Sequence, residues 1–171
     1  LPALRTLTER VQRDAEKEVL EGLDGRLLHV RSAHAALNTL LQGAGAIVNI
    51  SSIAGLVGLP YRNAYTASKH GVAGITKTLA GEWGQHGIRV NAVSPGYVLT
   101  PMVQKLIDAG KLDPKVLQRR TPLGRLAAPQ EIGNAMMFLA SPLASYINGA
   151  IIPIDGGYTA YGAAAPAVEI E

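Results

Sequence analysis

Three short apolar runs constrain the fold of this chain more than any other feature of its sequence. Two of them, at residues 46–51 and 88–94, are rich in isoleucine and valine, and a third follows at residues 150–154. Runs of this kind are typical of strands buried on both faces of a sheet. Segments of helical length and pattern, at residues 63–83 and 129–140, separate the runs, which favours right-handed parallel crossovers. We therefore predict an α/β fold with a doubly wound parallel sheet.

Other segments of the chain have weaker signals. Apolar residues recur at helical spacing over residues 4–20 and 27–41, which predicts two further helices before the first strand. Residues 101–125 are polar, contain prolines, and show helical patterns only at 102–109 and 114–119. An insertion of this kind beside the carboxyl end of a strand predicts a mobile substrate lid.

Composition excludes several classes of site. The chain of 171 residues has no cysteine and only four scattered histidines, so we expect no disulfide, no thiol nucleophile and no metal site. The net charge of +3 comes from bases that alternate with acids near the amino terminus, which argues against nucleic-acid binding.

The same composition favours one domain over residues 1–171, with a loose small-residue tail at 162–171. The longest apolar region, residues 45–59, is broken by polar residues and is too short to cross a bilayer. No signal peptide pattern opens the chain. We therefore expect a soluble protein of the cytoplasm that does not bind a membrane.

A hydroxyl, a phenol and an ammonium stand at spacings that one small site could use. Ser52 follows the carboxyl end of the first predicted strand, where α/β sheets bind their ligands. Tyr65 and Lys69 are four residues apart in the predicted helix and therefore share a face. A neighbouring cation lowers the pKa of a phenol, which allows proton exchange with an alcohol or carbonyl oxygen near neutral pH. The pattern predicts alcohol or carbonyl redox chemistry, with the serine hydroxyl bonded to the same oxygen.

The surroundings of these residues resemble a known family. Asn-Ile-Ser-Ser ends a strand thirteen residues before the tyrosine, Ser-Pro-Gly ends the next strand, and Leu-Gly-Arg-Leu and Ile-Asp-Gly-Gly-Tyr follow in order. From about His34 to Tyr161 the chain resembles the short-chain dehydrogenase/reductase family, most of all its polyol, sugar and 3-oxoacyl members. The resemblance implies a Rossmann-like fold, NAD or NADP as cofactor, and hydride transfer to or from a small secondary alcohol or ketone.

The resemblance also implies a role for individual residues. Tyr65 would be the general acid and base, Ser52 would position the substrate oxygen, and Lys69 would tune the tyrosine and bind the nicotinamide ribose. Cofactor contacts would also come from the loop after the second strand, at Pro95, Gly96, Val98 and Thr100. Substrate contact or ordinary packing explains the following apolar residues equally well: Leu56, Val57, Tyr61, Met102, Leu106 and Ile107.

The chain also departs from the family. The glycine-rich turn that binds the cofactor pyrophosphate is absent, since Gly22 and Gly25 lie between two predicted helices. Asn38 lies too late in its predicted helix to be the asparagine that the family uses as a fourth catalytic residue. The residue that selects NAD or NADP is missing as well. Compared with the family, we therefore expect the amino-terminal nucleotide-binding half to be missing or incomplete in this sequence.

Two interpretations of this departure stay open. In the first, the sequence omits segments of a longer polypeptide, which is an enzyme. In the second, the protein is short by nature and is a non-catalytic remnant or an interaction subunit completed by a partner. The resemblance further implies a homodimer or homotetramer that forms through the helices at residues 27–41 and 63–83.

Overall fold

The computed structural model of this chain describes residues 45–170. Residues 46–171 form one compact unit. The helices predicted at residues 4–20 and 27–41, with Asn38, lie outside the described residues. The main described elements are β1 (Gly45–Ile50), α3 (Asn63–Trp83), β2 (Ile88–Pro95), α4 (Pro101–Asp108), α5 (Pro114–Arg120), α6 (Pro129–Ala140) and β3 (Ile151–Ile154). Three short 3-10 helices complete the described set: η1 (Ile53–Gly55), η2 (Gly84–His86) and η3 (Pro142–Ala144).

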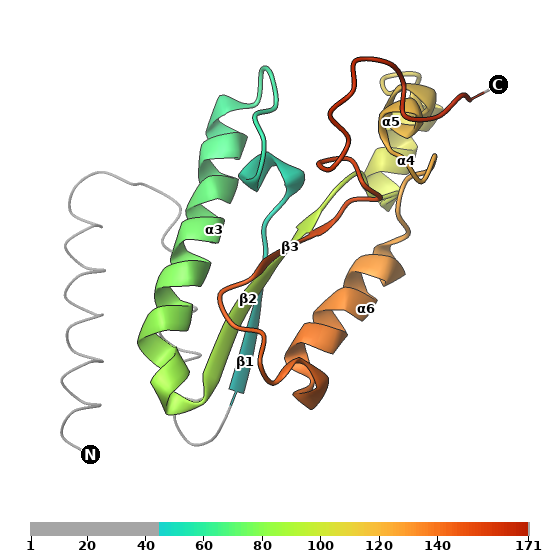
Figure 1. Cartoon of the computed structure of the whole chain (residues 1–171). Helices are drawn as coiled ribbons and strands as arrows, with labels where there is room; N and C mark the ends of the chain where they lie inside the picture. Colours follow the sequence, from blue (N-terminus) through green and yellow to red (C-terminus); the bar gives the residue numbers. More distant parts are fainter. Residues whose placement is uncertain (1–44, 171) are drawn as a thin grey trace. The chain divides into compact units, whose positions relative to one another are not determined.

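The described strands form one sheet in the order β1-β2-β3, so β2 lies in the middle. β2 and β3 are parallel, with Ala92 opposite Ile151. The N–H of Ser51, just past β1, donates to the Val93 carbonyl oxygen at 2.8 Å. Figure 1 shows α3 on one side of the sheet and α6 on the other. The predicted α/β fold with a parallel sheet and helices on both faces is confirmed.

Packing of the middle strand explains why each helix lies where it does. Val93 on β2 packs with Ile132 and Leu139 of α6 in one buried cluster. Trp83, the last residue of α3, is fully buried, and so is Ile88 at the start of β2. β2 is covered on both faces, because Val90, Asn91, Ala92 and Val93 are all fully buried although their side chains point alternately to opposite faces of the sheet.

Two asparagines, Asn91, which is buried, and Asn148, which is exposed, connect the segments around β2. The amide of Asn91 donates to the Ile147 carbonyl oxygen at 2.8 Å and accepts from the Ala150 N–H at 2.9 Å. Asn148 accepts from the Val90 N–H at 2.8 Å and donates to a carbonyl oxygen near the end of α3 at 3.0 Å. The loop before β3 is therefore joined to both β2 and α3 by side-chain hydrogen bonds.

Helices α4 and α5 confirm the weak helical signals between residues 101 and 125. Thr100 caps α4 and Asp113 caps α5, each by accepting a hydrogen bond from a backbone N–H of the first turn. Residues 162–170 form no helix or strand, but they contact α5 (Figure 1). The Ala167 N–H donates to the Arg119 carbonyl oxygen at 2.7 Å, and the guanidinium of Arg119 donates to the Ile170 carbonyl oxygen at 3.1 Å.

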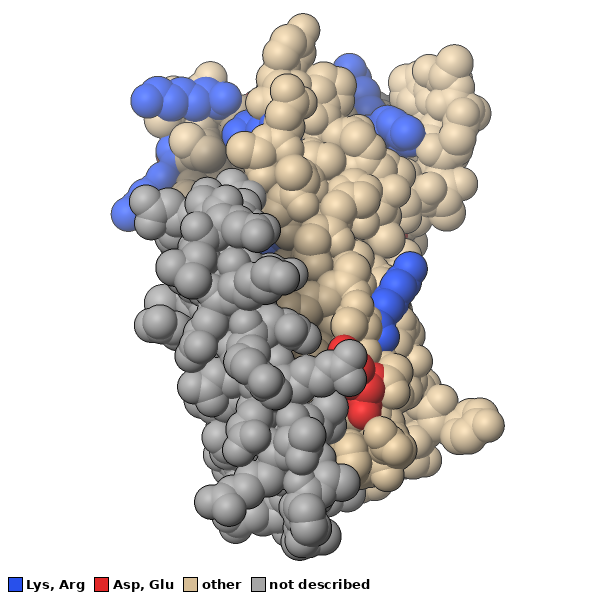
Figure 2. Space-filling view, turned by 90° about the vertical axis from the view of Figure 1, so that its left-hand side faces the viewer, with Lys and Arg blue, Asp and Glu red and all other residues tan. Residues whose placement is uncertain are grey.

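Two surface properties follow from the described elements. None of the helices in the described part of the chain has the length and apolar content needed to span a bilayer. Figure 2 shows basic side chains at several separate places on one face of the molecule.

Candidate active site

Ser52 is positioned by the abrupt end of β1. Its side chain is only 8% exposed, and its backbone is extended, with φ −170° and ψ 164°. The hydroxyl oxygen accepts a hydrogen bond from the Ala54 N–H at 3.2 Å and so caps η1. Because Oγ acts there as an acceptor, the hydroxyl proton can be donated to the oxygen of a ligand.

Tyr65 and Lys69 lie in the first two turns of α3. The Lys69 Nζ atom lies 5.7 Å from the centroid of the Tyr65 ring, within the range of a cation–π contact. Tyr65 is 47% exposed, so its phenol is accessible to a ligand. The structure therefore brings the predicted phenol and ammonium together on one helix face.

Direct contacts join this helix face to the end of β1. Lys69 Nζ donates to the Ile50 carbonyl oxygen at 3.0 Å. The Ser51 hydroxyl donates to the Lys69 carbonyl oxygen at 3.1 Å. Gly55 permits this approach, because a Cβ atom there would lie 2.7 Å from the Lys69 carbonyl oxygen. The segment that carries Ser52 is therefore packed directly against the turn that carries Lys69.

Ser51 and Gly55 were not identified as site residues from the sequence. A signal was present, since small residues follow the strand in the order Ser-Ser-Ile-Ala-Gly. Small residues are required where backbone segments approach closely. The contact that gives them meaning joins residues 18 positions apart in the chain, from Ser51 to Lys69, and local patterns do not reveal it.

The loop after β2 contains the second predicted group. A Cβ atom at Gly96 would lie 2.9 Å from the Asp155 Cα atom, so only glycine lets this loop approach the end of β3. Val98 forms an isolated parallel bridge with Ala127, and Thr100 caps α4. Each of these residues therefore has a structural role in the loop. Within the described residues, no hydrogen bond joins these residues of the loop after β2 to Ser52, Tyr65 or Lys69.

The apolar residues considered for substrate contact have different environments. Leu56, Val57 and Ile107 are half-buried, whereas Met102 is 70% exposed. Tyr61 is fully exposed and has a φ of 63°, which is uncommon for a residue other than glycine. The loop between Ser52 and Tyr65 is thus strained at an exposed aromatic residue.

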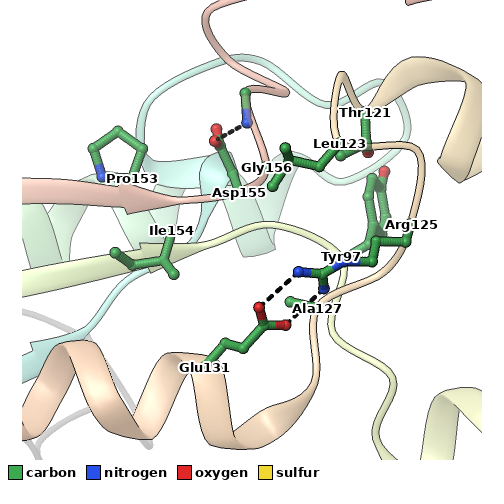
Figure 3. Close-up of a pocket in the computed structure, with 11 residues that line it drawn as sticks. Tyr97, Thr121, Leu123, Arg125, Ala127, Glu131, Pro153, Ile154, Asp155 and Gly156 are labelled. Atoms are coloured by element: carbon green, nitrogen blue, oxygen red, sulfur yellow. Dashed lines mark hydrogen bonds and ion pairs between the residues drawn. The ribbon is translucent and has the colours of Figure 1, made fainter. Parts of the chain in front are cut away.

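A cavity of about 270 Å³ lies elsewhere, between the end of β3, the start of α6 and the loop after β2 (Figure 3). It does not include Ser52, Tyr65 or Lys69. The following residues line it: Tyr97, Thr121, Leu123, Arg125, Ala127, Glu131, Pro153, Ile154, Asp155, Gly156 and Gly157. No pattern in the sequence predicts this cavity.

The charged groups of the cavity are bonded within the protein. Arg125 donates to both carboxylate oxygens of Glu131, at 2.7 and 2.8 Å. This hydrogen bonding, with a further bond from the Ala128 N–H, lowers the pKa of Glu131 to about 2. Asp155 accepts from the N–H groups of Gly157 and Thr159, each at 2.9 Å.

Tyr97 is the remaining titratable residue of the cavity. Burial raises the pKa of the Tyr97 phenol, and the neighbouring Tyr158 raises it further. The two rings meet edge to face with centroids 5.6 Å apart. Glu131 is held in an ion pair with Arg125, and burial raises the pKa of the Tyr97 phenol. The better candidate for the reactive site is therefore the set of Ser52, Tyr65 and Lys69. No cluster of three potential metal ligands occurs in the part of the chain that the structure describes.

Comparison with known proteins finds relatives that are named as dehydrogenases and reductases. The family model described as enoyl-(acyl carrier protein) reductase matches residues 27–159. An uncharacterized short-chain type dehydrogenase/reductase of Sinorhizobium fredii is 56% identical over 119 residues, covering 70% of this chain and 22% of the relative. Galactitol 2-dehydrogenase of Cereibacter sphaeroides is 48% identical over 122 residues, covering 70% of this chain and 48% of that protein.

A solved structure agrees with the sequence comparison. The structure of ElxO with NADP bound has a TM-score of 0.71 and 39% sequence identity, and the match covers 74% of this chain and 51% of that chain. The chain spans about a fifth to a half of the length of these relatives. The family match over residues 27–159 and the shared parallel sheet show that the chain belongs to the short-chain dehydrogenase/reductase family.

Proposed function

We propose that the protein carrying this chain is an NAD(P)-dependent oxidoreductase that transfers hydride between the cofactor and a secondary alcohol or ketone. The observation that carries the proposal is the contact between the end of β1 and α3, in which the Lys69 ammonium lies beside the Tyr65 ring and bonds to Ile50, two residues before Ser52. The bound nicotinamide would supply or accept the hydride. The remaining steps belong to the side chains of this chain.

Each of the three side chains has a different role toward the reacting oxygen of the substrate. In the oxidative direction, Tyr65 Oη accepts the proton of the substrate hydroxyl as the carbon loses hydride to the cofactor. In reduction it returns that proton to the alkoxide oxygen. Ser52 donates a hydrogen bond to the same oxygen. Lys69 places a positive charge beside the phenol, which stabilises the negative charge that Tyr65 carries during transfer.

The donor set also fits a nicotinamide ribose. The Lys69 ammonium and the Tyr65 phenol can both bond to its hydroxyl groups, and both are at the accessible end of α3. We assign the wall beside the nicotinamide to the loop after β2, at Pro95, Gly96, Val98 and Thr100. Use of NAD or NADP as the cofactor stays a prediction. Assembly as a homodimer or homotetramer and a cytoplasmic location also stay predictions.

A polyol or sugar alcohol is the proposed substrate class, with 3-oxoacyl thioesters as the next choice. Galactitol 2-dehydrogenase and D-threitol dehydrogenase are among the relatives, at 48% and 51% identity. A 3-oxoacyl-[acyl-carrier-protein] reductase of Thermotoga maritima is 47% identical. We propose that α4 and α5 close over this substrate as a lid.

The replacement Tyr65→Phe tests the proposal directly. We expect turnover of galactitol or D-threitol with NAD⁺ or NADP⁺ to fall by at least about 100-fold, because the proton acceptor is lost. Cofactor affinity, measured by fluorescence titration with NADH and NADPH, should change by less than about threefold. Tyr146→Phe is the matched control, since Tyr146 is fully exposed and remote in sequence from the site.

Two results would contradict the proposal. Turnover that survives Tyr65→Phe would remove the tyrosine from the proton-transfer role. A protein that binds neither NADH nor NADPH would favour the rival interpretation, a non-catalytic subunit that lacks its own phosphate loop.

A further inference from the structure

Two hydrogen bonds of opposite direction join the end of β1 to α3. The side chain of Lys69 donates to the backbone of Ile50, at 3.0 Å. The side chain of the next residue, Ser51, donates to the backbone of Lys69, at 3.1 Å. Each element thus supplies one donor and one acceptor, and the pair of bonds restrains both sliding and separation of the two segments.

The position of Ser51 makes its bond a strong restraint. Ser51 is only 2% exposed, so water has little access to replace the lost partner. Gly55 closes the same contact from the other side, because a Cβ atom there would touch Ser51 Oγ and the Lys69 carbonyl oxygen. The hydroxyl therefore occupies a close-packed space between η1 and α3 rather than a mobile surface position.

We propose that Ser51 is a positioning residue, whose hydroxyl holds the Lys69 turn of α3 in register with the Ser52 hydroxyl. The proposal rests on the oxidoreductase function argued above. Ser52 follows Ser51 directly, and Tyr65 lies one turn before Lys69. A shift of β1 along α3 would therefore change the distance between the serine hydroxyl and the phenol that act on one substrate oxygen.

The variant Ser51→Ala removes this bond and keeps the rest of the site. We expect kcat to fall about tenfold, because misalignment by a fraction of an ångström weakens proton transfer. Cofactor affinity for NADPH or NADH should stay within about threefold of the unmodified protein. Thr78→Ala is the matched control, because it removes a hydroxyl-to-carbonyl bond of the same helix, at Gly74, on an exposed face.

A double-mutant cycle separates positioning from simple loss of folded protein. In the Ser52→Ala background the hydroxyl to be aligned is gone, so Ser51→Ala should lower kcat by less than about twofold. An equal tenfold loss in both backgrounds would overturn the proposal, and so would an unchanged kcat in Ser51→Ala alone. If Ser51→Ala does not fold, Ser51→Cys enters the same cycle, because a thiol is a weak donor.

Hydrogen exchange tests the restraint without any need for turnover. The amide protons of Gly55 and Leu56, bonded to the Ser52 and Ile53 carbonyl oxygens, should exchange faster in Ser51→Ala than in Thr78→Ala. Equal exchange rates would overturn the role of Ser51 even in an active enzyme. Absence of turnover in the unmodified protein, with exchange altered as expected, would instead contradict the proposed function alone.

Discussion

At the scale of single residues, the contact between β1 and α3 depends on the lack of a side chain at Gly55. A Cβ atom there would lie 2.7 Å from the Lys69 carbonyl oxygen, which belongs to helix backbone and yields little. The requirement for glycine is therefore one of space. The segment that carries Ser52 can pack against the Lys69 turn of α3 because Gly55 has no side chain.

The replacement Gly55→Ala should be costly for this reason. We expect it to lower the free energy of unfolding by about 1–3 kcal/mol, the usual cost of overpacking, and to reduce turnover because it separates Ser52 from α3. Urea denaturation and steady-state kinetics measure the two effects. Gly58→Ala is the matched control, since nothing lies within 4 Å of an added Cβ at Gly58. Equal stability of the two variants would contradict the steric argument.

Local spacing predicted where the candidate site residues lie but not what surrounds them. Ser52 follows a strand, and Tyr65 and Lys69 share one helix face, as local rules predict. Their catalytic roles stay predictions. The roles of Ser51 and Gly55 depend on which turn of α3 the strand end meets. That choice follows from packing between segments that are distant in sequence, which spacing alone does not specify.

At the scale of single elements, the start of α6 has one half of a capping box. Ala128 stands at the cap position and has no side-chain acceptor, but the Glu131 carboxylate accepts from the Ala128 N–H at 2.8 Å. Arg125 holds the same carboxylate through two hydrogen bonds (Figure 3). The sequence predicted the helix but not this arrangement, because Arg125 lies in the preceding loop.

The lowered pKa of Glu131 predicts a specific pH dependence. Its folded-state pKa of about 2 lies below the ordinary value of 4.5. The ionised carboxylate therefore contributes stability above about pH 4.5, and this contribution is lost as the pH falls toward 2. In Arg125→Gln, the Glu131 pKa measured by NMR should rise toward 4.5, yet stay below it because the Ala128 N–H still donates.

Because Arg125→Gln also removes a positive charge, a second variant controls for the charge alone. Lys111→Gln removes one positive charge from the turn between α4 and α5, and it should leave the Glu131 titration unchanged. Below about pH 4.5, the free energy of unfolding should depend less on pH in Arg125→Gln, and it should not change in this way in Lys111→Gln. If the Glu131 pKa is the same in Arg125→Gln as in the unmodified protein, the ion pair does not form in solution.

At the scale of the whole described unit, the asparagines around β2 connect the middle strand to the segment before β3. Asn91 is fully buried and satisfies backbone groups at Ile147 and Ala150. The apolar core does not supply these partners. The pairing of β2 with β3 therefore depends on a side chain from the middle strand as well as on the backbone ladder.

The replacement Asn91→Ala should strongly destabilise the protein. It leaves one carbonyl oxygen and one N–H without partners in the interior, so we expect the free energy of unfolding to fall by about 2–4 kcal/mol. Asn134→Ala on α6 is the control, because Asn134 is exposed and bonds only to Gln130 among the described residues. That variant should stay within about 0.5 kcal/mol of the unmodified protein in urea denaturation.

Prediction of the whole unit succeeded for its elements and failed for the links between them. The strands and helices of residues 46–154 follow from hydrophobic period and from glycine and proline boundaries, which are local. The cavity beside Tyr97 and the bonds of Asn91 and Asn148 join positions more than fifty residues apart, such as Asn91 and Ala150 at a separation of 59. Only the folded topology places those residues in contact.

That separation has a consequence for biosynthesis. Asn91 leaves the ribosome before its partner Ala150 has been added, 59 residues later. At 5–20 residues per second the delay is about 3–12 s. Throughout this interval β2 has an unpaired edge, and the amide oxygen of Asn91 lacks its native donor, the Ala150 N–H. The nascent chain is therefore at its most vulnerable to misassociation after the reactive residues have been made and before β3 exists.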